Sequence, residues 1–142
     1  MSAEIKGSCL CGQIRFATPE PLRPVIACHC TQCRKTAGHF VAATSALRTS
    51  VTIAGAPRWY DSSSKVRRGF CPKCGSQLFW DGKGTHLSIF ARCIDGATGV
   101  RMAEHIFFAN KGDYYEIADG LPQAPAEDSV LTTRVDSAEG NP

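Results

Sequence analysis

The sequence lacks any long run of apolar residues. Hydrophobic residues make up 43% of the 142 positions, but no apolar stretch approaches the roughly 20 residues that span a bilayer. The first residues, from Met1 to Lys6, also lack the basic and apolar blocks of a secretory signal peptide. We therefore expect a soluble, cytoplasmic protein that does not associate with a membrane.

A dense charge of one sign is absent as well. The formal net charge is +3, and the Lys and Arg residues are scattered apart from the short group Lys65, Arg67 and Arg68. Nucleic-acid-binding domains usually present a dense basic face, so we expect no nucleic-acid partner. This charge is still compatible with a small anionic ligand.

The sequence has no long helical period, and short β-prone segments separated by turns predict a mostly β fold. In residues 5–16 the alternation places Cys9 and Cys11 on one face of a single strand. Further strands are expected at residues 25–30, 40–44, 51–53, 66–70, 77–80, 86–90 and 105–108, with a closing segment at 114–117.

The chain length predicts one domain. From about residue 121 the composition turns to Pro, Ala, Asp, Ser and Thr, which is typical of segments that do not pack into a core. We therefore assign residues 1–122 to the domain and expect residues 123–142 to form a flexible tail.

Cysteine is abundant, with eight residues in the chain. Without an export signal, metal binding or catalysis is favoured over a disulfide framework. Seven of the eight cysteines fall into three groups, which are Cys9 with Cys11, Cys28 with Cys30 and Cys33, and Cys71 with Cys74.

The first and last groups predict a closed zinc site. Cys9 and Cys11 are two residues apart, so they can reach one ion from the same side of a strand. Cys71 and Cys74 have the Cys-x-x-Cys spacing of a zinc knuckle, followed by Gly75. These four thiolates would saturate one tetrahedral zinc ion that pins the N-terminal strand to a distant hairpin and stabilises the fold.

The middle group, Cys28, Cys30 and Cys33, offers three thiolates and therefore predicts a catalytic zinc with one open position. Cys93 could instead supply a fourth ligand, which would give two closed structural sites. His29 is expected to point away from its neighbouring cysteines and to pack or hydrogen-bond behind the site. The chain's other histidines are expected to be structural or exposed, namely His39, His86 and His105.

The order and spacing of these motifs closely resemble the family of glutathione-dependent formaldehyde-activating enzymes and centromere protein V. The matching segments are Gly7-Ser8-Cys9-Leu10-Cys11-Gly12, Cys28-His29-Cys30-Thr31-Gln32-Cys33-Arg34-Lys35-Thr36-Ala37-Gly38, Phe70-Cys71-Pro72-Lys73-Cys74-Gly75-Ser76 and His105-Ile106-Phe107. The resemblance implies a twisted, mostly antiparallel fold of the β-tent type, also found in a guanine-nucleotide-exchange chaperone. It further implies a structural zinc at the four cysteines and a catalytic zinc at the three.

Two departures from the family pattern concern the substrate. Arg92-Cys93-Ile94-Asp95 stands where the family often has a Gly-Ser-Leu-Asp-like stretch, and Tyr114 or Tyr115 stands where the closing segment often carries tryptophan. Cys93 is thus an extra thiol, and both changes bear on which substrate the protein accepts.

Three thiolates donate charge to zinc and make it a weak acid, so binding a thiol suits this site better than generating hydroxide. The resemblance implies a carbon-sulfur lyase that acts on glutathione and formaldehyde. Basic side chains would hold the glutathione carboxylates, with Arg34 and Lys35 favoured over Arg67, Arg92 and Lys111. The alternatives are a protein-binding module with two structural zinc ions, and a zinc module for nucleic acid, which the mild charge disfavours.

Overall fold

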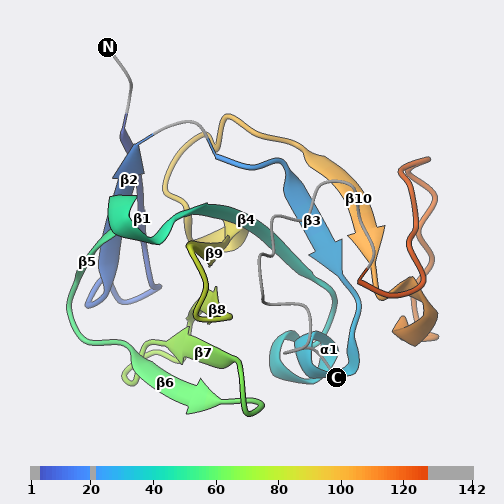
Figure 1. Ribbon diagram of the computed structural model, residues 1–142, viewed down its shortest axis with the longest axis horizontal. Helices are drawn as coiled ribbons and strands as arrows, with labels where there is room; N and C mark the ends of the chain where they lie inside the picture. The colour runs from blue at the N-terminus through green and yellow to red at the C-terminus, as the bar shows by residue number, and fades with distance from the viewer. Residues whose placement is uncertain (1–3, 20–21, 128–142) are drawn as a thin grey trace.

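The computed structural model describes residues 4–19 and 22–127, and within them ten strands form two sheets (Figure 1). The strands are β1 (Glu4–Ser8), β2 (Arg15–Pro19), β3 (Val25–Cys28), β4 (Val41–Leu47), β5 (Thr52–Ala54), β6 (Arg58–Asp61), β7 (Arg67–Phe70), β8 (Gln77–Asp81), β9 (His86–Phe90) and β10 (Met102–Ile106). The helical elements are α1 (Thr31–Ala37) and the 3-10 turns η1 (Arg48–Ser50), η2 (Ala91–Cys93) and η3 (Phe108–Asn110). The predicted mostly β class with twisted sheets is confirmed.

The smaller sheet has the order β1-β2-β5 and is antiparallel throughout. Gly7 in β1 faces Phe16 in β2, and a Cβ atom at this glycine would lie 2.1 Å from the Phe16 ring and 2.4 Å from the Cys93 carbonyl oxygen. The Phe16 ring also meets Phe79 of β8 edge to face, with ring centroids 5.5 Å apart. The absence of a side chain at Gly7 therefore lets the small sheet pack closely on the large one.

The larger sheet has the order β10-β3-β4-β9-β8-β7-β6 and curves from β10 to β6 (Figure 1). Its pairs are antiparallel, except that β10 runs parallel to β3. The parallel pair places His105 of β10 beside Ala27 of β3 and brings Ile106, the end of β10, beside Cys28, the end of β3.

Two hydrophobic clusters form the core, and each contains cysteines from a different group. The larger cluster joins the two sheets and includes Cys9 and Cys71. The smaller cluster lies around β3, β10 and α1 and includes Cys30 and Cys33. Each candidate metal site is therefore built into a separate part of the core.

The predicted single strand at residues 5–16 is wrong. The chain forms two strands there, with a turn between them that is closed by hydrogen bonds from the Cys9 amide to the Ile14 carbonyl, 3.0 Å, and from the Gly12 amide to the Cys9 carbonyl, 3.0 Å. Gly12 has a φ of 81°, a conformation that favours glycine. The alternation of apolar and polar residues continues through this turn, so periodicity alone did not reveal it.

The helix α1 was not predicted, because its seven residues are too few to show a helical period. Its N-cap is Cys30, whose sulfur accepts a hydrogen bond from the Cys33 amide, and it ends at Gly38 with a φ of 82°. The predicted strand at 25–30 therefore stops at Cys28. The strand expected at 105–108 is β10, which lies earlier in the chain, and residues 114–117 form no strand.

The chain continues along β10 after it leaves the sheet. The His105 amide donates to the Pro122 carbonyl, 2.9 Å, and the Phe107 amide donates to the Ala126 carbonyl, 2.8 Å. The domain boundary proposed at residue 122 stays a prediction, and residues 128–142 of the expected tail lie outside the described residues.

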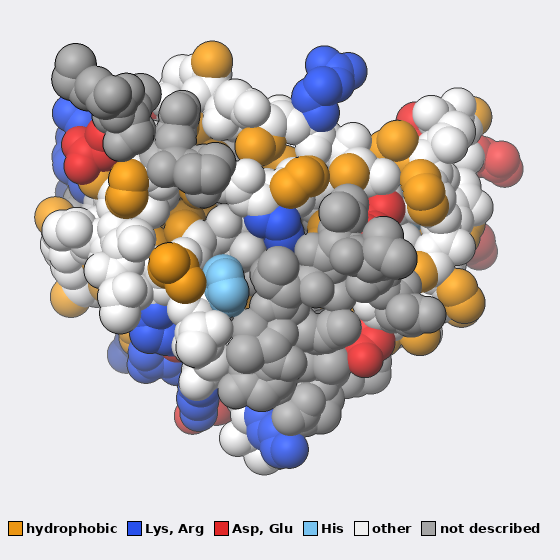
Figure 2. Space-filling view, turned by 45° about the horizontal axis from the view of Figure 1, so that its top comes forward, with side chains coloured by type: hydrophobic (Ala, Val, Ile, Leu, Met, Phe, Trp, Pro, Cys, Tyr) orange, Lys and Arg blue, Asp and Glu red, His pale blue; other side chains and the backbone are white. Residues whose placement is uncertain are grey.

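Within residues 4–19 and 22–127, no helix is long and apolar enough to cross a membrane. On the face that Figure 2 shows, Lys and Arg side chains are dispersed among apolar and neutral ones. This dispersion agrees with the mild net charge of +3.

Candidate metal centres

The four-cysteine cluster, Cys9, Cys11, Cys71 and Cys74, is assembled by two turns that are far apart in the sequence. The first two cysteines lie in the turn between β1 and β2, and the other two in the turn between β7 and β8. Their four sulfurs all lie within 4.8 Å of one another. The arrangement joins the small sheet to the large one, as the spacing predicted, although a turn rather than strand alternation brings the first pair together.

The sulfur spacings of this cluster fit tetrahedral zinc. The Cys9 and Cys11 sulfurs are 3.6 Å apart, and the Cys11 and Cys71 sulfurs are 3.7 Å apart. Four sulfurs at zinc-ligand distance occupy tetrahedron corners about 3.8 Å apart. The four-cysteine cluster could therefore hold a zinc ion.

Backbone amides point at these sulfurs. The Ile14 amide donates to the Cys9 sulfur, 3.2 Å, and the Lys73 amide donates to the Cys71 sulfur, 3.4 Å. The Ser76 hydroxyl lies 3.2 Å from the Cys74 sulfur, and this hydrogen bond lowers the pKa of Cys74 to about 5. These donors stabilise thiolates, which are the form that binds a metal ion.

The three-cysteine cluster, Cys28, Cys30 and Cys33, comes from a short continuous segment. Cys28 ends β3, Cys30 caps α1, and Cys33 lies in the first turn of that helix. Their sulfurs lie within 4.8 Å of one another, and among the described residues no fourth cysteine, histidine or carboxylate joins them. Cys30 and Cys33 are buried, whereas Cys28 is partly exposed. Cys28 is thus the member of the cluster most accessible to solvent.

The sulfurs of this cluster hydrogen-bond to one another. Hydrogen bonds from Cys28 and Cys33 lower the pKa of Cys30 to about 3. The hydrogen bond between Cys28 and Cys30 also raises the pKa of Cys28. A lowered pKa at one of the three sulfurs favours the thiolate, which is the form that binds a metal ion. Together, the two cysteine clusters could hold two metal ions.

Arg68 is a buried cation beside the three-cysteine cluster, and sequence reasoning did not single it out. Its side chain is 2% exposed, and it donates to the Cys33 sulfur, 3.7 Å, and to the Gln32 amide oxygen, 3.1 Å. Strand alternation was the signal available, because the neighbours Arg67 and Arg68 in β7 must point to opposite faces. A guanidinium at this place offsets negative charge on the sulfurs.

A chain of four side chains runs behind the three-cysteine cluster. The Tyr115 hydroxyl lies 2.6 Å from His29 Nδ1, His29 Nε2 lies 2.9 Å from His105 Nδ1, and His105 Nε2 lies 2.8 Å from a carboxylate oxygen of Asp119. Both histidines are fully buried. The prediction that His29 hydrogen-bonds behind the site is confirmed, as is the structural role expected of His105.

The Asp119 carboxylate sets the direction of every hydrogen bond in this chain. The carboxylate accepts, so His105 donates through Nε2 and accepts through Nδ1. His29 then donates through Nε2 and accepts the Tyr115 hydroxyl proton at Nδ1. Burial, together with the neighbouring His105, lowers the pKa of His29 to about 4, which keeps its ring neutral as this order requires.

Cys93 belongs to neither cluster. Its sulfur donates to the Gln77 carbonyl oxygen, 3.2 Å, and burial raises its pKa to about 11. It packs in the larger hydrophobic cluster, whereas Cys30 and Cys33 belong to the smaller one. The alternative in which Cys93 completes the three-cysteine cluster has no support in this geometry.

Arg34 and Lys35 lie on α1 directly after Cys33. Arg34 is half-buried, and its Nε atom is buried without a hydrogen-bond partner, whereas Lys35 is exposed. Their predicted contact with a substrate carboxylate stays a prediction.

Comparison with known proteins identifies the family. A model of the glutathione-dependent formaldehyde-activating enzyme family matches residues 4–110. The chain belongs to this family. A Halomonas elongata protein named as a candidate glutathione-dependent formaldehyde-activating enzyme is 32% identical over 128 residues, covering 80% of each chain. An uncharacterised lyase of Schizosaccharomyces pombe is 28% identical over 120 residues, covering 82% of this chain and 87% of its own.

Proposed function

We propose that this protein is a zinc-dependent carbon-sulfur lyase that acts on a thiol such as glutathione and a small aldehyde such as formaldehyde. The observation that carries the proposal is the contrast between a cluster of four sulfurs, which closes a tetrahedron, and a cluster of three, which leaves one corner free. Glutathione is the abundant thiol of the reducing cytoplasm, where we place the protein.

Each cluster would hold one zinc ion, the first structural and the second catalytic. Cys9, Cys11, Cys71 and Cys74 would hold the structural ion, and Cys28, Cys30 and Cys33 the catalytic one. At the free corner the catalytic zinc supplies a position that keeps the substrate thiol in its nucleophilic, deprotonated form.

Arg68 supports this assignment through its charge. Three cysteine thiolates and a divalent ion carry one net negative charge, and a bound substrate thiolate adds another. A buried guanidinium 3.7 Å from the Cys33 sulfur offsets part of this charge. Arg68 would therefore favour the state with the substrate bound.

The reaction forms or breaks one carbon-sulfur bond. In the forming direction, the substrate sulfur attacks the carbonyl carbon of the aldehyde, and the carbonyl oxygen takes up the proton that the thiol gave up. The product is a hydroxymethyl thioether, and the reverse reaction is the lyase step. No electrons are transferred to another molecule, so no redox cofactor is required.

The names of the relatives agree with this chemistry, since one refers to glutathione and formaldehyde and the other to a lyase. The proposal extends those names to this chain on the basis of the three-cysteine cluster and Arg68.

Zinc X-ray absorption with and without glutathione tests the proposal, together with metal content and an NMR assay of product formed from glutathione and formaldehyde. We expect two zinc ions per chain, an added sulfur ligand at one of them when glutathione is present, and faster product formation than in buffer. Cys93→Ala should leave the number of sulfur ligands unchanged.

Two four-sulfur sites that ignore glutathione would contradict the proposal, especially if Cys93→Ala disturbed one of them. That outcome would favour the alternative of a protein-binding module with two structural zinc ions. Zinc content of one ion per chain in an otherwise folded protein would also overturn it.

A further inference from the structure

His29 lies between two of the three clustered cysteines and is held at three of its atoms. Its Nδ1 accepts from the Tyr115 hydroxyl, 2.6 Å, and its Nε2 donates to His105 Nδ1, 2.9 Å. Its backbone amide donates to the Ile106 carbonyl, 3.0 Å. The planar peptide groups on either side of His29 are shared with the two neighbouring cysteines. A change in ring position that moves the His29 backbone therefore also moves both of their sulfurs.

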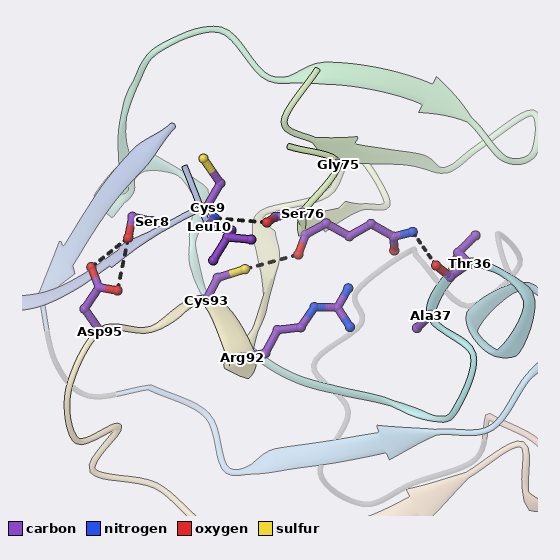
Figure 3. A pocket seen from close by; sticks show the side chains of 11 residues that line it. Ser8, Cys9, Leu10, Thr36, Ala37, Gly75, Ser76, Arg92, Cys93 and Asp95 are labelled. Carbon is purple, nitrogen blue, oxygen red and sulfur yellow. Dashed lines mark hydrogen bonds between the residues drawn. The ribbon is translucent and has the colours of Figure 1, made fainter. Parts of the chain in front are cut away.

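Cys33, the third member of the cluster, is held by different contacts. It lies in the first turn of α1, where its carbonyl accepts a hydrogen bond from the Thr36 hydroxyl, 3.2 Å. The Thr36 carbonyl in turn accepts from the Gln77 side-chain amide of β8, 2.9 Å (Figure 3). This end of α1 borders a cleft of about 530 Å³, which none of the three cysteines lines. The position of Cys33 thus follows from α1 and β8, and the position of the other two sulfurs follows from His29.

The bonds that hold the His29 ring come from one short segment, residues 115–119. The Tyr115 ring stacks on the His29 ring, with centroids 5.7 Å apart and an interplanar angle of 23°, and it meets His39 edge to face at 4.2 Å. At the other end of the segment, Asp119 accepts from His105 Nε2, 2.8 Å. The segment therefore fixes one ring nitrogen of His29 directly and the other through His105.

We propose that Tyr115 and Asp119 are positioning residues of the three-cysteine cluster. By fixing both ring nitrogens of His29, they hold its two neighbouring sulfurs at the spacing that one metal ion requires. This inference rests on the proposed function only for the presence of a metal ion in the cluster. Substitution of groups that orient the ligands of a metal ion typically lowers metal affinity about 10- to 100-fold.

A chelator titration of the zinc-loaded, full-length protein measures the affinity of each cluster. Cys33→Ser, which should keep only the ion of the four-cysteine cluster, identifies the release of that ion. Tyr115→Phe and Asp119→Ala should each weaken zinc binding by the three-cysteine cluster about tenfold, with no change at the four-cysteine cluster. Cobalt(II) added to the emptied cluster should show shifted absorption bands in both variants, because these bands depend on ligand geometry.

Asp119→Asn separates hydrogen bonding from charge. It removes the negative charge, as Asp119→Ala does, but the Asn side chain offers both an acceptor and a donor, so the bond to His105 can still form. Asp119→Asn should therefore bind zinc and cobalt(II) as wild type does. If Asp119→Asn lost as much affinity as Asp119→Ala, the inference would be overturned, because charge rather than orientation would then be responsible.

Tyr114→Phe is the matched control for Tyr115→Phe. The Tyr114 hydroxyl donates to the Gly38 carbonyl, 2.9 Å, and makes no hydrogen bond to His29. This change should leave the zinc affinity of both clusters unaltered. Equal losses in Tyr114→Phe and Tyr115→Phe, or weaker binding at both clusters in Tyr115→Phe, would indicate a general role in folding and overturn the inference.

These outcomes separate the positioning role from the proposed function. If Tyr115→Phe and Asp119→Ala weaken only the three-cysteine cluster but glutathione leaves the zinc ligands of wild type unchanged, the positioning role stands and the lyase proposal fails. If glutathione joins the zinc ligands but both variants bind zinc as wild type does, the lyase proposal stands and the positioning role is overturned. A wild type that holds only the ion of the four-cysteine cluster would overturn both.

Discussion

The four-cysteine and three-cysteine clusters use the same ligand atom in different surroundings. The first joins turns that are about half the chain apart in sequence, between β1 and β2 and between β7 and β8. The second comes from residues 28 to 33, and the protein needs no long-range contact to bring its sulfurs together. The first cluster therefore connects distant parts of the fold, whereas the second is local and is embedded beside a buried cation.

We therefore expect the four-cysteine cluster to contribute mainly to the stability of the fold and the three-cysteine cluster mainly to reactivity. A metal ion in the four-cysteine cluster would crosslink the two sheets, so its binding energy would contribute directly to folding. A metal ion in the three-cysteine cluster would fix only one short segment, which the α1 cap and β3 already order. Substitutions in the two clusters should therefore have different consequences.

The largest effect is expected for Cys71→Ser. Structural zinc contributes about 10–16 kcal/mol of apparent binding free energy, which is comparable to the whole stability of a domain, about 5–15 kcal/mol. We expect this variant to lose the cooperative unfolding transition in circular dichroism. Cys93→Ser, a buried cysteine outside both clusters, is the control and should keep it. A Cys71→Ser protein with wild-type unfolding would remove the distinction between the clusters.

The next effect is expected for Cys33→Ser, which should lose one metal ion and the lyase activity but remain folded. Its cost in the free energy of unfolding should be no more than about 3 kcal/mol, as for an ordinary core substitution. Metal analysis combined with urea unfolding measures both quantities. Global unfolding comparable to that of Cys71→Ser would show that the local cluster is also a structural crosslink.

Arg68→Met should have an intermediate effect that is confined to the three-cysteine cluster. Loss of a charged hydrogen bond of about 1.5–3 kcal/mol corresponds to a decrease in kcat/KM of about 10- to 160-fold. Arg67→Met is the matched control, because the neighbouring side chain in β7 stacks on Trp59 and pairs with Asp81 on the other face. Similar activity losses in the two variants would argue against a specific role for Arg68.

The smallest effect is expected for Asp81, which ends β8 and belongs to neither cysteine cluster. Its carboxylate accepts hydrogen bonds from Arg48, 2.5 Å, and Arg67, 2.9 Å. Burial alone would raise the pKa of Asp81, but these hydrogen bonds outweigh burial and lower it. Asp81→Asn should cost about 2 kcal/mol at neutral pH.

The sign of the pH dependence follows from the lowered pKa. The stabilisation by Asp81 is complete above the unfolded pKa of about 3.9, and it is lost as the pH falls through the lower value of the folded state. Urea unfolding at several pH values should therefore show a difference between wild type and Asp81→Asn that disappears in strong acid. A difference that grows towards low pH would contradict this account.

Local features of the molecule could be predicted from the sequence. The strands β8 and β9 follow from short β-prone runs with turn residues between them, and the ligand groups follow from cysteine spacing. The Cys28 to Cys33 segment is the clearest case for the choice of ligands, although the start of α1, which was not predicted, is what brings the three sulfurs within 4.8 Å of one another. Each of these features is marked by residues that lie close together in the sequence.

Features that depend on distant contacts could not be predicted. The turn between β1 and β2 has no break in its apolar alternation, and only Gly12 marks it. Arg68 is adjacent in sequence to Arg67, yet one guanidinium is buried and the other is partly exposed, which depends on the strands that flank β7. The chain from Tyr115 to Asp119 joins residues as much as 86 positions apart, and no spacing rule connects them.

The hydrogen-bonded chain behind the three-cysteine cluster also determines how much polypeptide the fold requires. The family match ends at residue 110, but Tyr115 and Asp119 lie beyond it. A protein shortened at that residue would leave one ring nitrogen of His29 and one of His105 buried without a partner. Each such loss costs about 1–3 kcal/mol, so we expect a chain cut at the end of the matched segment to be less stable than one that includes Tyr115 and Asp119.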